Sequence, residues 1–151
     1  MKFIFEAIIN CPVEELYGFL WTLDERDFSD NPLVPIYERV TEGPRRVGSI
    51  IREVVQTPLI RMEVFSEITR NAPNEHLEYD FWSDGMRGEL AYQLDAAEDG
   101  TRLIQRVNIR LIGARKILTP LLPLFYKPRV AKRLEAIKDI LEKKHQETGN
   151  T

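Results

Sequence analysis

The amino-acid sequence predicts an α+β fold, in which a curved seven-stranded antiparallel β-sheet wraps around one long C-terminal α-helix. Three observations predict it. A β-rich segment occupies residues 2–9, short alternating segments separated by Gly and Pro turns fill residues 34–112, and apolar residues recur at helical spacing over 113–145. We expect the final helix to cover the apolar face of the sheet, because no other element is long enough.

The first strand is expected over residues 2–9, with one face made of Phe3, Phe5, Ala7 and Ile9. Two short helices are expected after it. Pro12 suits the first position of a helix, and Glu14 and Glu15 fall in the first turn, where the helix dipole favours negative charge. This helix is expected to end around Asp24, and a second short helix or turn to follow before Pro32.

The middle of the chain predicts a meander of six strands, at 35–40, 48–56, 60–69, 75–83, 86–96 and 101–112. Two of these segments alternate clearly between polar and inward-facing residues. The inward set is Met62, Val64, Ser66 and Ile68 in one segment, and Leu103, Gln105, Val107, Ile109 and Leu111 in the other. One face of the sheet is therefore expected to meet solvent and the other an interior.

The C-terminal segment is the most apolar part of the chain, and it carries Pro120, Pro123 and Pro128. A proline inside a helix removes a backbone hydrogen bond at a cost of ~3 kcal/mol, so one straight rod is not expected. We predict a bent or stepped first half and a regular helix from about Pro128. The weakly bonded half would form a gate at one end of the interior. The lysines of the second half alternate with acidic residues, which indicates a solvent-exposed face.

Composition narrows the class of protein. A net charge of −3 gives no basic excess for binding nucleic acid. The single cysteine, Cys11, fits a reducing compartment, and no apolar run reaches the ~18 residues that span a bilayer. The N-terminal residues lack the pattern of a signal peptide, so we expect a cytoplasmic protein. Residues 1–147 are expected to form a single domain and 148–151 a disordered tail.

Two short motifs, set in this order of elements, carry a resemblance. The first is N-C-P-V-E-E-L-Y at 10–17, and the second is G-P-R-R-V-G-S at 43–49. Over about residues 2–144 the chain resembles the START-like, or SRPBCC, superfamily, and within it the polyketide cyclase/dehydrase and lipid-transport branch. Phe28 stands where relatives often carry Trp. The resemblance implies a helix-grip fold with a hydrophobic cavity, but not one chemistry, because members include carriers, receptors, cyclases and chaperone cofactors.

Familiar catalytic and metal-binding patterns do not occur in the sequence. His76 and His145 are the only histidines, and neither has a second ligand at zinc-binding spacing. Hydrolase, nucleotide-binding and metalloprotease motifs are missing as well. Cys11 has no neighbouring base and is interpreted as a small, partly buried structural residue. We therefore expect no metal and no cofactor, and the catalytic residues, if any, stay unknown.

The sequence predicts a protein that binds a small hydrophobic molecule, such as a lipid, isoprenoid or polyketide, between sheet and helix. We expect it to be a monomer or homodimer. Ser66 and Gln105 are polar residues on apolar faces and would orient the ligand. The expected binding residues are Met62, Val64, Ser66, Ile68, Tyr79, Phe81, Leu90, Tyr92, Gln105, Val107, Ile109, Leu118, Leu122 and Phe125.

Two alternatives remain open. An aromatase/cyclase enzyme acting on a polyketide in the same space would need inward acid–base groups, and Glu53, Tyr79, Tyr92 and Gln105 are the candidates. The strand around 50–56 reads equally well with Glu53 inside or outside, so its orientation is not fixed. The other alternative is a protein-interaction module with Trp82 and the region of Tyr126 as contact points.

Overall fold

The structure is a computed structural model that describes residues 1–23, 36–56 and 61–149. Its elements follow one another as β1 (Lys2–Ile9), α1 (Val13–Trp21), β2 (Ile36–Arg39), β3 (Ile50–Gln56), β4 (Arg61–Ala72), β5 (His76–Ser83), β6 (Met86–Ala97), β7 (Gly100–Leu111), the 3-10 helix η2 (Gly113–Leu121) and α2 (Leu122–Gly149).

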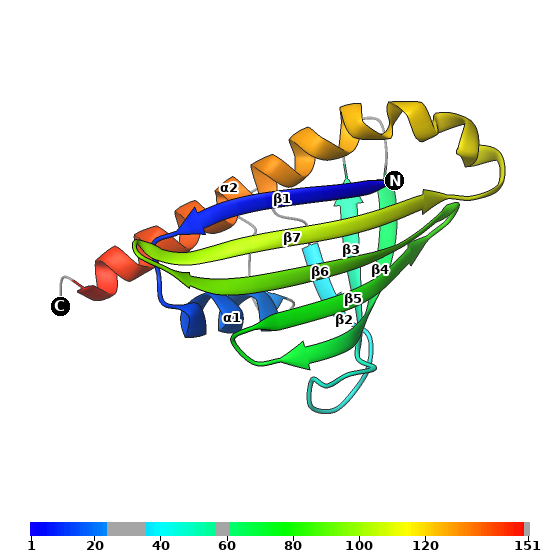
Figure 1. Ribbon diagram of the computed structural model, residues 1–151. Coiled ribbons are helices and arrows are strands. Elements are labelled where there is room, and N and C mark those ends of the chain that lie inside the picture. Colours follow the sequence, from blue (N-terminus) through cyan, green and yellow to red (C-terminus); the bar gives the residue numbers. More distant parts are fainter. Residues whose placement is uncertain (24–35, 57–60, 150–151) are drawn as a thin grey trace.

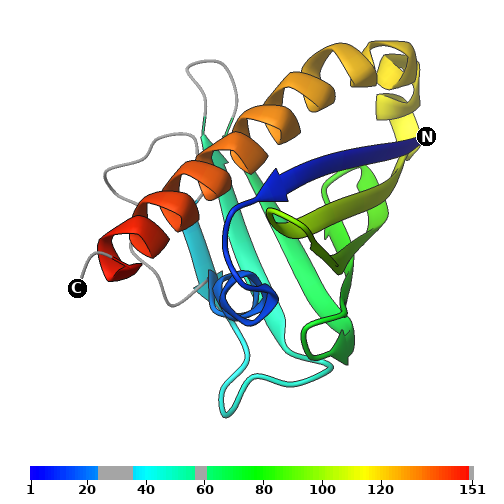
Figure 2. The same ribbon diagram turned by 60° about the vertical axis from the view of Figure 1, so that its left-hand side comes forward.

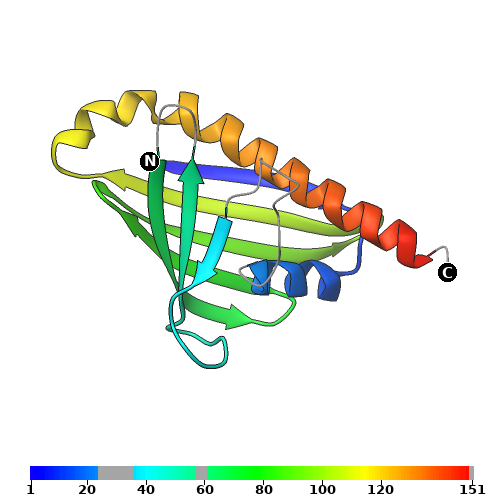
Figure 3. The same cartoon turned by 180° about the vertical axis from the view of Figure 1, so that it is seen from behind.

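The seven strands form one antiparallel sheet in the order β1-β7-β6-β5-β4-β3-β2. The first strand, β1, pairs with the last strand, β7, and forms one edge of the sheet, while β2 forms the other. The helix α2 runs across the concave face of the sheet (Figures 1 and 2). Seen from behind, β3 runs steeply across the direction of β1 and β7 (Figure 3). A register shift between Ile68 and Arg70 of β4 contributes to this bend, since bulges increase strand twist. The predicted sheet and long C-terminal helix are confirmed.

The first two elements follow the local rules of the sequence. Phe3 and Ile9 are buried on the inner face of β1, as expected. The helix α1 begins directly after Pro12, but it ends at Trp21 rather than near Asp24. Thr22 follows as the C-cap residue, and its backbone N–H and its hydroxyl both donate to the carbonyl oxygen of Gly18. The predicted second short helix lies outside the described residues.

The core forms where α2 and α1 meet the concave face of the sheet. α2 contributes a buried stripe made of Val130, Leu134, Ile137 and Leu141, as its 3–4 spacing predicted. These side chains pack in one cluster with Leu16 and Leu20 of α1 and with Leu77 and Leu103 of the sheet. The helix is thereby fixed over the sheet through most of its length.

The proline-rich segment is stepped, but the step lies earlier than predicted. Residues 113–121 form η2, and the α-helical geometry starts at Leu122, so Pro123 and not Pro128 occupies the first turn. Pro128 lies inside α2, where it leaves the carbonyl of Leu124 without its helical donor. Leu124 is exposed, which lets water bind that carbonyl. α2 also continues to Gly149, so residues 148 and 149 of the predicted tail are helical.

No helix among the described residues is long and apolar enough to cross a bilayer.

Candidate functional site

The concave face of the sheet collects most of the side chains that the sequence predicted as ligand-binding. Ladder partners such as Leu90 and Val107, or Tyr92 and Gln105, share this face because directly opposed residues of antiparallel strands point the same way. Leu122 of α2 packs against them. The structure brings twelve predicted residues to this region: Met62, Val64, Ser66, Ile68, Tyr79, Phe81, Leu90, Tyr92, Gln105, Val107, Ile109 and Leu122.

Leu118 and Phe125 are not part of this face. Their side chains are 49% and 72% exposed, respectively. The cause is the step at residue 121, which turns the α-helical stripe so that Leu122 and Tyr126 point inward instead. Leu118 and Phe125 are therefore left out of the candidate site.

The structure settles the orientation of β3. Glu53 pairs with Tyr37 of β2 and with Val64 of β4, and both partners pack into the interior. Ile51, two residues earlier on the same face, is buried. Glu53 therefore lies on the inner face, which is the arrangement that an acid–base role would require.

Arg133 is the main inward-facing residue that the sequence analysis missed. A positive charge on this helix favours the solvent-exposed face, as for the lysines, but the guanidinium Nη2 of Arg133 donates to the hydroxyl of Tyr92 at 3.3 Å. The guanidinium carbon also lies 5.4 Å from the centre of the Tyr37 ring, a cation–π arrangement. Its position three residues after Val130 and four before Ile137, on the predicted apolar stripe, was the signal that could have placed it inside.

Gln105 lies near the middle of β7, between Phe5 of β1 and Tyr92 of β6. It is 1% exposed, and neither its Oε1 nor its Nε2 has a hydrogen-bond partner among the described residues. The Nε of Arg133 is likewise buried without a partner there. Together with Tyr37, Glu53 and Tyr92, these two residues form what we call the inner polar cluster. Unsatisfied amides are rare in folded interiors, so this cluster requires an explanation.

The charges of the inner polar cluster follow from its burial. Burial raises the pKa of Tyr92 and raises that of Tyr37 well above its ordinary range, so both hydroxyls stay neutral at neutral pH. Burial alone would lower the pKa of Arg133, but the facing Tyr37, Tyr92 and Glu53 outweigh it and the pKa is raised. No ion pair joins Arg133 to a carboxylate of the described residues. Arg133 therefore stays positively charged on the inner side of the sheet, beside Tyr37, Tyr92 and Glu53.

Two further candidate residues lie elsewhere. Cys11 is buried, and its burial, with the nearby charges of Glu15 and Glu142, raises the pKa of the thiol to about 11. The thiol is therefore protonated at neutral pH and is a poor nucleophile. His76 is half-buried on the opposite face of β5 from Tyr79, as the strand alternation predicted.

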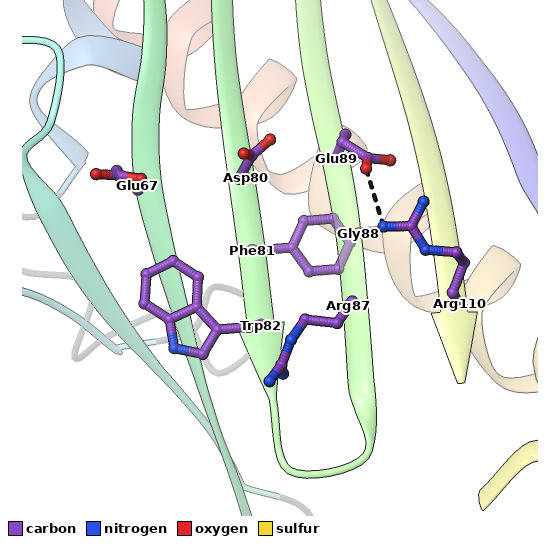
Figure 4. Close-up of a pocket in the computed structure, with 8 residues that line it drawn as sticks. All are labelled: Glu67, Asp80, Phe81, Trp82, Arg87, Gly88, Glu89 and Arg110. Carbon is purple, nitrogen blue, oxygen red and sulfur yellow. Dashed lines mark hydrogen bonds and ion pairs between the residues drawn. The ribbon is translucent and has the colours of Figure 1, made fainter. Parts of the chain in front are cut away.

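The outer face of the sheet carries an open pocket of about 380 Å³ around Trp82 (Figure 4). Glu67, Asp80 and Glu89 occupy successive strands there, and Arg110 forms an ion pair with Glu89 at 3.1 Å. The described residues hold no group of potential metal ligands. This charged, solvent-facing pocket lacks the apolar lining that small-molecule sites usually have.

The two contact points proposed for a protein-interaction module differ in position. Trp82 stacks on Phe65 of the neighbouring strand, with ring centres 6.0 Å apart. Tyr126 turns inward and packs against the rings of Phe3 and Phe5, at 5.2 and 6.2 Å. The two side chains therefore belong to different layers and do not form one surface.

Comparison with solved structures supports the fold. An aromatase/cyclase, Zhui, from Streptomyces sp. R1128 superposes with a TM-score of 0.77 at 11% identity, covering 94% of this chain and 93% of that one. The protein Ara h 8.0201 gives 0.70 at 17%, covering 94% and 95%. The di-domain aromatase/cyclase StfQ of the steffimycin biosynthetic pathway gives 0.74 at 13%, covering 96% of this chain and 52% of that one.

No protein-family model and no curated protein sequence matches the chain. The structural likeness shows that the chain has the helix-grip fold that the sequence predicted.

Proposed function

We propose that this helix-grip protein binds a small, mostly apolar molecule between the concave face of its sheet and α2, with an oxygen-bearing end against the inner polar cluster. One observation carries the proposal. Gln105 is buried, and neither of its amide atoms has a hydrogen-bond partner in the described part of the chain, beside the Arg133–Tyr92 hydrogen bond. A fold that only needed a packed core would place an apolar residue here, because each unpaired buried polar atom costs about 1–3 kcal/mol.

The chemistry of the cluster indicates the kind of ligand. Gln105 offers an NH2 donor and a carbonyl acceptor, Tyr92 a neutral hydroxyl, and Arg133 a positive charge. A carboxylate or a carbonyl oxygen can accept from the Gln105 NH2, the Tyr92 hydroxyl and the Arg133 guanidinium. The side chains around them, including Leu90, Val107 and Ile109, are apolar and suit a hydrocarbon, isoprenoid or aromatic body. Lipids and polyketides both combine these two parts.

The test is a titration with anilinonaphthalene sulfonate, an apolar anion whose fluorescence rises when it leaves water. We expect saturable binding with about one site per chain. The variant Val107→Trp should weaken it at least about tenfold, since the added ring occupies the ligand's space. The matched control is Ile4→Trp, on the exposed face of β1.

Circular dichroism and urea unfolding of both variants show whether they fold. Binding that does not saturate would contradict the proposal, and so would a folded Val107→Trp variant that binds as tightly as the unmodified protein. If Val107→Trp does not fold, Gln105→Met takes its place, with the same expected loss of affinity.

The inward position of Glu53 supports a second candidate, an aromatase/cyclase type of reaction in the same space. A carboxylate there could remove a proton from a carbon between two carbonyls, while Arg133 stabilises the enolate oxygen. Two of the structures with the same fold are aromatase/cyclases. The test is deuterium exchange at the central carbon of a β-diketone, followed by NMR. Loss of this exchange in Glu53→Gln but not in Glu63→Gln, whose carboxylate pairs with Arg52 on the outer face, would support catalysis.

A further inference from the structure

The start of the C-terminal helical region carries an apolar patch on its outer side. We define this exposed apolar patch as Ile117, Leu118, Leu121, Leu124 and Phe125, whose side chains are 44% to 82% exposed. The patch belongs to η2 and the first turn of α2, which project beyond the end of the sheet (Figure 1). Contiguous exposed apolar side chains of this size mark interaction surfaces.

The patch is not needed for the core of the protein. Leu122 and Tyr126, from the same segment, turn inward and complete the cluster around Phe3 and Val107. None of the residues 113–121 is buried. The segment therefore has an inner side that packs on the core and an outer apolar side that no part of residues 1–23, 36–56 or 61–149 covers.

The charged residues of the segment that carries the patch all have one sign. Residues 113–134 contain six basic residues and no acidic residue, in a chain whose net charge is −3. Arg115 forms an ion pair with Asp84 at 3.5 Å, and Arg133 faces the interior. The remaining basic side chains are exposed: Lys116, Lys127, Arg129 and Lys132. The patch is thus rimmed by positive charge.

We propose that the exposed apolar patch docks on the surface of an anionic lipid bilayer. Its apolar side chains would enter the boundary between headgroups and acyl chains, and the four exposed cations would lie among the lipid phosphates. The same charges disfavour a second copy of this chain as the occupant, because a symmetric interface would bring both sets of cations together. The inference does not depend on the proposed ligand.

The test is co-sedimentation of the full chain with vesicles of phosphatidylcholine mixed with phosphatidylserine, and with vesicles of phosphatidylcholine alone. We expect binding at least about tenfold stronger to the mixed vesicles and weakened by salt. The double variant Leu124→Ser/Phe125→Ser should lose at least about tenfold in affinity. Lys116→Gln/Lys127→Gln should lose about fivefold for each charge removed.

Matched controls come from exposed residues away from the patch. Val47→Ser removes an apolar side chain from the loop before β3, and Lys143→Gln removes a charge near the end of α2. Both should bind as the unmodified protein does. The proposal is overturned if the mixed vesicles do not bind the protein, or if patch and control variants bind equally. It is also overturned if sedimentation shows a dimer that the patch variant dissociates while vesicle binding is unchanged.

Discussion

Replacing Gln105 by Met should make the ligand-free protein more stable and should lower its affinity for the ligand. The amide is buried, and its two polar atoms have no hydrogen-bond partner among the residues that the structure describes, at a cost of about 1–3 kcal/mol each. Methionine has a similar length and adapts to the same space. Allowing for imperfect packing, we expect the free energy of unfolding to rise by about 1–3 kcal/mol, or the melting temperature by roughly 3–9 °C for a chain of this size.

Urea unfolding without ligand measures the change, at an unaltered dependence on denaturant. The matched control is Gln93→Met on the outer face. Gln93 accepts from Arg106 at 2.7 Å and donates to Asp95 at 3.1 Å, so the control should lose up to about 1 kcal/mol. The affinity for anilinonaphthalene sulfonate should fall about tenfold in Gln105→Met and stay constant in the control. Destabilisation of the Gln105→Met variant by more than about 1 kcal/mol would refute the reasoning, since it would show that the amide has partners.

The remaining predictions concern packing, titration and local opening. Gly88→Ala should destabilise the fold by about 1–3 kcal/mol in thermal unfolding, because an added Cβ would lie 2.2 Å from the Phe81 ring; an unchanged midpoint would contradict this. The Cys11 thiol loses its proton at lower pH in the unfolded chain than in the folded one, so the free energy of unfolding should fall as the pH rises from 9 to about 11. Thiol labelling of the folded protein that is fast at pH 8 would contradict this. Amide hydrogen exchange should be faster at 114–127 than at 132–141, and the reverse order would exclude a weak gate.

The sheet and the buried stripe of α2 could be predicted because each follows from one regular spacing of apolar residues in the sequence. Alternation over residues 61–69 and 101–112 placed Ser66 and Gln105 on the inner face, and ladder pairing across the strands repeats that assignment. The stripe from Val130 to Leu141 is fixed in the same way by 3–4 spacing. Where one face of a strand or helix is clearly apolar, the sequence determines which of its residues point inward.

The inner polar cluster could be predicted only in part. Arg133 was missed because its charge suggested solvent, whereas its spacing from Val130 and Ile137 placed it inside. Glu53 stayed undecided because both faces of β3 carry apolar residues, and its pairing with Tyr37 and Val64 resolves the orientation. The start of α2 at Leu122 could not be predicted, because Pro120, Pro123 and Pro128 could each occupy the first turn of a helix.

The central claim is that the interior holds an apolar ligand by its oxygen-bearing end, and the affinity of a fluorescent fatty acid relative to its methyl ester tests it most directly. In the unmodified protein the acid should bind at least about tenfold more tightly, because Arg133 attracts a carboxylate. In Arg133→Met both compounds should bind with about equal affinity. An unchanged preference in that variant, or no saturable binding of either compound to the unmodified protein, would contradict the claim.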